Sequence, residues 1–130
     1  MEWYETTEGY QRLLWECHFL SQDYPSMQVQ RGVDGIMRAT GILGPSNLAN
    51  RRMYIVAEFP SNYPNGRPRV YAPYETFPPN TPHIYPSCDI ELCTFHGADF
   101  GPDDTMSTVL GWTIQWIALY DKFRETDERW

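Results

Sequence analysis

The sequence predicts one α+β domain, residues 1–130, in the order N-terminal helix, antiparallel four-stranded meander, long loop and second helix. Apolar residues recur at helical spacing near both ends of the chain, and short alternating or apolar runs follow the first of these segments. Most of the eleven prolines lie in the middle third, where they predict a loop. A chain of 130 residues is long enough to bury a single core.

The first helix is predicted over residues 7–24. Thr6 or Thr7 can cap its start, and Pro25 prevents its continuation. Cys17 is expected to be an ordinary core residue of this helix. The predicted apolar face consists of Tyr10, Leu13, Leu14, Cys17 and Leu20.

Four short strands are expected next. The Asp34-Gly35 pair predicts a hairpin turn between the first two, and residues 44–47 read as a loop. The third strand is the most apolar and is expected to be largely buried. The predicted strand ranges are 27–30, 36–43, 52–59 and 70–71.

A long ordered loop is predicted within residues 60–86, because proline, asparagine and tyrosine are dense there. Long loops in small domains usually serve function. The second helix is expected over residues 105–123, followed by a charged tail that ends at Trp130.

Composition excludes several classes of function. The net charge is −7 and no basic run is present, so we expect no nucleic-acid partner and favour a basic protein partner. No apolar stretch is long enough for a membrane span, and the acidic start lacks the pattern of a signal peptide. Three cysteines, an odd number, argue against a disulfide framework, so we expect a reducing cytoplasmic location and no cofactor.

Cys93 is the first candidate for chemistry, because it follows the proline-rich loop and precedes the last helix. A reachable thiolate there could accept an acyl group as a thioester and pass it to an amine. Residue identity alone favours the other reading, a buried core cysteine, because free cysteine is among the most buried residue types.

Two other readings involve the same region. His83, Cys88, Cys93 and His96 are all potential zinc ligands, but the five-residue cysteine spacing is poor for a structural zinc site. A thiol protease would need His83 or His96 against Cys93 and a third group to orient the ring, and no such signature is present.

The order of motifs resembles the ubiquitin-conjugating-enzyme family. Residues 58–70, read as EFPSNYPNGRPRV, resemble the family's Phe-Pro, Tyr-Pro and later Pro that lead into a strand. His83 falls where the family's His-Pro-Asn begins, and Cys93 follows it by the family's ten residues, directly after the apolar Leu92. Further matches downstream are Pro102, Thr105 and the run Thr108, Val109 and Leu110.

This resemblance implies the family's fold and a transferase with a cysteine nucleophile. Cys93 would accept the C-terminus of a carrier protein as a thioester and transfer it to an amine. His83 would shape the loop rather than act as a base. The nearest polar groups that could orient the acceptor or the oxyanion are Tyr85, His96 and Asp99.

Three departures from the family pattern are present. Ile84 and Tyr85 replace the family's Pro and Asn, so the side chain that stabilises the oxyanion in the family is missing. Phe100 stands near the place of the family's Trp, and the family's C-terminal helices are missing. These features are similar to the divergent bacterial branch found in antiphage operons. There the carrier is a ubiquitin-like protein or a cGAS-like nucleotidyltransferase, with an activating enzyme in some systems. The alternatives are a non-catalytic binding module of the same fold and a zinc-stabilised interaction domain.

The second helix carries an unusually wide apolar arc. At the helical period its apolar residues span about 260°, whereas a helix on one sheet needs a stripe of roughly 100°. The tail and the first helix could cover the excess from within. Alternatively, a second copy in a homodimer or the nucleotidyltransferase-like partner could cover it.

Overall fold

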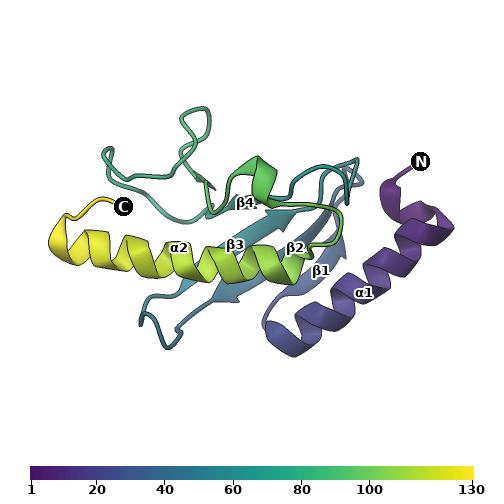
Figure 1. Ribbon diagram of the computed structural model, residues 1–130, viewed down its shortest axis with the longest axis horizontal. Coiled ribbons are helices and arrows are strands. Elements are labelled where there is room, and N and C mark those ends of the chain that lie inside the picture. Colours follow the sequence, from purple (N-terminus) through teal and green to yellow (C-terminus); the bar gives the residue numbers. More distant parts are fainter.

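The computed structural model describes residues 1–130 and has an α+β architecture in which α2 lies across one face of a sheet and α1 lies beside the β1 end (Figure 1). This confirms the predicted fold class. The elements are η1 (Trp3–Glu5), α1 (Thr7–Asp23), β1 (Gln28–Arg31), β2 (Met37–Leu43), β3 (Met53–Glu58), β4 (Arg69–Tyr71), β5 (Glu91–Leu92), η2 (Gly97–Asp99) and α2 (Met106–Thr126).

The sheet is an antiparallel meander in which spatial order equals chain order, β1 to β5. It has five strands rather than the predicted four. The additional strand, β5, pairs Leu92 with Val70 of β4. Two residues are too few to show a strand period, so this pairing arises only from the tertiary fold.

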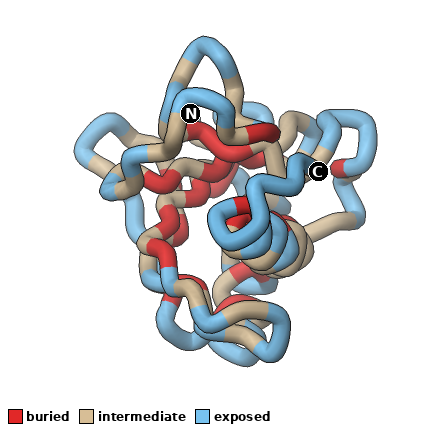
Figure 2. The backbone as a smooth tube through the Cα atoms, turned by 90° about the vertical axis from the view of Figure 1, so that its left-hand side faces the viewer, coloured by how far each residue is buried: buried red, intermediate tan, exposed pale blue.

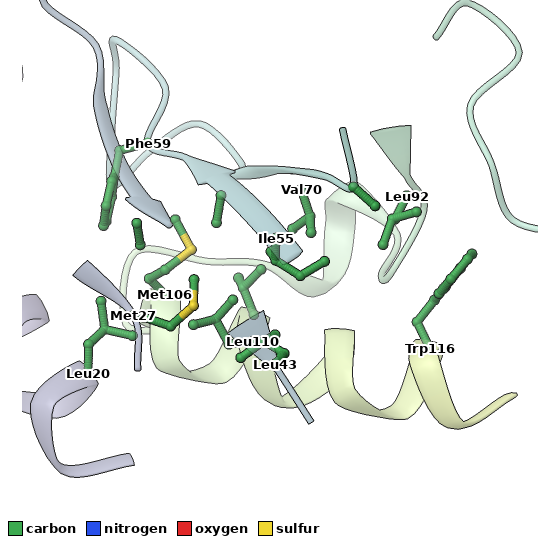
Figure 3. Packing of buried hydrophobic residues seen from close by; sticks show 14 of the residues in the cluster. Leu20, Met27, Leu43, Ile55, Phe59, Val70, Leu92, Met106, Leu110 and Trp116 are labelled. Atoms are coloured by element: carbon green, nitrogen blue, oxygen red, sulfur yellow. The ribbon is translucent and has the colours of Figure 1, made fainter. Parts of the chain in front are cut away.

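The core lies between the sheet and α2. Alternate residues of β3 point inward, so Met53, Ile55 and Ala57 are buried while their neighbours are only partly buried. Figure 2 shows buried residues concentrated along the strands, with exposed loops around them. In Figure 3 the cluster extends from Leu20 and Phe59 at one end to Leu92 and Trp116 at the other.

The predicted inner face of α1 is partly wrong. Tyr10 and Leu14 are exposed, whereas Glu16 is fully buried. Cys17 is half-buried, at the margin of the core rather than within it. The helix turns this face inward because a polar network satisfies the carboxylate of Glu16 there, and an apolar pattern gives no sign of such a network.

Most of the apolar arc of α2 is covered within the chain. Trp116, Tyr120 and Phe123 are buried, and the ring of Trp130 packs edge-on against Trp116 and Phe123. Leu119 remains exposed. The tail therefore covers part of the arc, and self-association stays a prediction. Neither α1 nor α2 combines the length and the apolar character that a membrane crossing requires.

Candidate active site

Backbone pairing fixes the loop that carries Cys93. The Cys93 amide donates to the carbonyl of His83 at 2.9 Å, and the Tyr85 amide donates to the carbonyl of Glu91 at 3.0 Å. Between these bonds, Ile84 and Leu92 form an antiparallel bridge. Because β5 is itself paired with β4, the cysteine stands directly at the end of the sheet. A two-sided backbone frame of this kind holds the thiol in a defined position.

His83 adopts a left-handed backbone conformation, with φ of 56°. A non-glycine residue in this region costs about 1 kcal/mol or more and persists only where its surroundings fix it. Those surroundings are evident here. The His83 carbonyl also accepts a hydrogen bond from Trp116 Nε1 at 3.1 Å. The imidazole stacks on Trp130, and its Nε2 lies 2.8 Å from the Trp130 carbonyl oxygen. His83 therefore joins the loop, α2 and the tail.

An open depression of about 530 Å³ lies between this loop and α2. Six of its eleven lining residues are hydrophobic and the others are polar, a mixture typical of ligand-binding sites. The polar and sulfur-bearing residues that line it include four of the predicted site residues, His83, Cys93, His96 and Asp99. The other lining residues are Thr94, Phe95, Trp112, Gln115, Trp116, Leu119 and Trp130.

Cys93 is half-buried at the edge of the depression, with its sulfur 3.8 Å from the carbonyl oxygen of Phe95. Two buried side-chain oxygens have no hydrogen-bond partner, Glu91 Oε2 and Thr94 Oγ1. Both belong to residues within two positions of the cysteine. Glu91 Oε2 lies 3.9 Å from Arg69 Nε, so this carboxylate has an ion-pair partner within the chain.

Tyr85 lies on the segment that pairs with the Cys93 segment, and it does not line the depression. The guanidinium carbon of Arg67 lies 5.0 Å from the centroid of the Tyr85 ring. Burial, and then the negative charge that a Cys93 thiolate carries, raise the pKa of Tyr85, while the charge of Arg67 opposes this. The tyrosine therefore stays protonated at neutral pH and can donate a hydrogen bond.

The remaining candidates lie at the periphery. His96 and Asp99 are exposed at the two ends of the short turn η2, where Asp99 Oδ2 accepts the His96 amide at 3.4 Å. Cys88 lies in the turn before β5 and does not line the depression.

The geometry supports neither a zinc site nor a thiol protease. The structure contains no cluster of three or more His, Cys, Asp or Glu side chains that could hold a metal ion, so the suggested zinc set is not assembled. The His83 imidazole contacts Trp130 rather than the cysteine sulfur, so it does not form the dyad of a thiol protease.

Sequence reasoning missed several residues of the site. Trp112, Trp116 and Leu119 follow one another at helical spacing on α2, which places them on one side of the helix but does not show what they face. For Arg67 and Trp130 no sequence signal exists, because each reaches the site only through the tertiary fold.

Comparison with known proteins points to one family. The profile of the family E2-CBASS, described as "Type II CBASS E2 protein", matches residues 16–130. Among solved structures, the chain is similar to a ubiquitin-conjugating enzyme E2 from Plasmodium falciparum, with 24% identity and a TM-score of 0.56. That similarity covers 86% of this chain and 85% of the other, and it supports the fold. No curated protein matches the sequence.

Proposed function

Since the chain belongs to the type II CBASS E2 family, conjugating enzymes of antiphage defence, we propose that it carries an acyl group as a thioester on Cys93. The acyl group is the C-terminus of a carrier protein, and the final acceptor is an amine. The observation that carries the proposal is that Cys93, held at the end of the sheet by the backbone bond to His83, lines the depression beside α2.

The chemistry proceeds in two acyl transfers. The Cys93 thiolate attacks the carbonyl carbon of an activated carrier C-terminus, a new C–S bond forms, and the activating group leaves with its electron pair. An amine then attacks the same carbon, the C–N bond forms, and the Cys93 thiolate is released. The proton of the attacking amine passes to solvent.

The depression suits the carrier tail. An extended peptide can place its side chains over Trp112 and Leu119 on the apolar wall that α2 provides. We propose a ubiquitin-like protein or a cGAS-like nucleotidyltransferase as carrier, with an activating enzyme where the system has one. The location proposed for this reaction is the cytoplasm.

Supporting roles follow from the contacts. We propose that His83 shapes the loop rather than acting as a base, since its imidazole stacks on Trp130 and its carbonyl holds Cys93 and Trp116. His96 and Asp99 stand on the exposed rim, where they can orient an approaching acceptor.

A charging assay tests the proposal. The protein is mixed with its carrier, and with the activating enzyme where one exists, and is analysed with and without reductant. We expect an adduct that reductant removes, its loss in Cys93→Ala and a more persistent ester in Cys93→Ser. Cys88→Ala is the matched control and should charge normally. Normal charging of Cys93→Ala would show that the nucleophile is another residue.

A further inference from the structure

Tyr85 and Cys93 project from one side of a small antiparallel ribbon. The backbone bonds from Tyr85 to Glu91 and from Cys93 to His83 place the two segments in register around the pair formed by Ile84 and Leu92. Leu92 is buried in the core, and alternate residues of a strand face opposite sides. Tyr85 and Cys93 therefore share the side of the ribbon opposite to Leu92, where they are diagonal neighbours across the two segments.

Arg67 holds the ring of Tyr85 from the opposite loop. Its guanidinium lies over the ring at 5.0 Å, a distance at which a cation and an aromatic face attract each other. Its aliphatic part packs against Gly97, where an added Cβ would lie 3.4 Å from Arg67 Cδ. Arg67 makes no salt bridge with a carboxylate. The stack on Tyr85 is thus the specific interaction of this guanidinium.

Resting on the proposed function of Cys93, we infer that Tyr85 donates a hydrogen bond to the oxyanion formed when an amine attacks the Cys93 thioester. We further infer that Arg67 acts as the positioning residue that holds the ring of Tyr85 in place. Tyr85 is the diagonal neighbour of Cys93 across the ribbon and does not line the depression. The carrier tail can therefore occupy the depression while the hydroxyl reaches the carbonyl oxygen from the other side.

The electron flow defines what Tyr85 must do. As the amine nitrogen bonds to the thioester carbon, the carbonyl electron pair moves to oxygen and creates a negative charge next to the sulfur. A hydrogen-bond donor placed there in advance stabilises this negative charge more than it stabilises the neutral carbonyl of the resting thioester, so it lowers the barrier. When the C–S bond breaks, the carbonyl forms again and the negative charge leaves with the Cys93 thiolate.

The test separates acylation from discharge. A fluorescein-labelled peptide ending in Gly-Gly, prepared as its mercaptoethanesulfonate thioester, is used to acylate the full chain, and intact mass confirms the adduct. Excess probe is removed, free L-lysine is added, and the loss of thioester is followed in single turnover. The variants are Tyr85→Phe, which keeps the ring, and Arg67→Met and Arg67→Lys. Tyr74→Phe serves as control because Tyr74 is exposed and stacks only on Tyr54.

Tyr85→Phe is acylated to completion before the amine is added, and we expect the acylated variant to discharge about 10-fold to 100-fold more slowly than the wild type, up to the lower end of the 10²–10³-fold cost of removing an oxyanion donor. Arg67→Met should slow discharge in the wild-type background but add nothing in the Tyr85→Phe background, because it acts through the tyrosine. Arg67→Lys should recover part of the rate, since a cation returns. A merely structural role for Arg67 would slow both backgrounds equally.

Two results would overturn the inference in distinguishable ways. If Tyr85→Phe is acylated on Cys93 and discharges like Tyr74→Phe, the role of Tyr85 is wrong while the proposed function stands. If the probe gives the same adduct in Cys93→Ala as in the wild type, the proposed function fails and the inference fails with it.

Discussion

Replacing Glu16 with alanine is expected to destabilise the protein by about 3–5 kcal/mol, the cost of breaking a buried ion pair by removing one partner. Glu16 is fully buried. Its Oε2 accepts Arg12 Nε at 2.9 Å and the hydroxyl of Tyr63, and its Oε1 accepts the Met106 amide at 2.9 Å. Each donor left unsatisfied costs about 1–3 kcal/mol before the site relaxes or admits water. The carboxylate thus joins α1, the proline-rich loop and the first turn of α2.

Urea unfolding followed by far-ultraviolet circular dichroism measures this change, provided that the denaturant slope stays constant. Glu8→Ala is the matched control, an exposed acidic residue of the same helix that should cost less than about 1 kcal/mol. The double variant Arg12→Met with Glu16→Leu should be more stable than Glu16→Ala, because no unpaired charge remains. A loss for Glu16→Ala no larger than that for Glu8→Ala would refute the reasoning.

Three further predictions concern pH, the second cysteine and the tail. Burial and the charge of Glu16 raise the pKa of Tyr63 above its ordinary value, so this tyrosine contributes stability that is present below about pH 10 and is lost as pH rises further. Tyr63→Phe should therefore flatten, in part, the alkaline fall of the unfolding free energy, whereas an unchanged slope would contradict the assignment. Purified protein should contain no stoichiometric zinc. A chelator should leave the thermal stability of the protein unchanged, and so should the substitution Cys88→Ala. One equivalent of bound metal would restore the zinc reading. Trp130→Ala should speed the reaction of Cys93 with a thiol reagent by uncovering one wall of the depression, and an unchanged rate would show that Trp130 does not limit access.

The fold could be predicted from the sequence wherever a local period was long enough. The helix predicted over residues 7–24 ends one residue earlier, and the one predicted over 105–123 continues to Thr126. The turn at Asp34-Gly35 forms as expected, with Gly35 at φ of 84°. β5 was not predicted, because its two residues pair only through the tertiary fold.

The site shows the same division. Motif spacing placed His83 and Cys93 together, and the structure brings them into backbone contact. Burial of Glu16 could not be foreseen, because a charged residue on a helix reads as solvent-exposed until its partners are known. The contact of Arg67 with Tyr85 could not be predicted either, because the two residues are far apart along the chain and no local pattern indicates that they stack.

The stack between Trp130 and His83 determines how the protein should be handled in the laboratory. Figure 1 shows the C-terminal end beside the loop that precedes β5, and Trp130 also lines the depression that contains Cys93. Any residues joined after Trp130, such as an affinity tag or a fluorescent fusion, begin at the wall of the candidate site. A fusion before Met1 starts instead beside η1, among residues that do not line this depression. Labels attached at the N-terminal end therefore suit every assay described above.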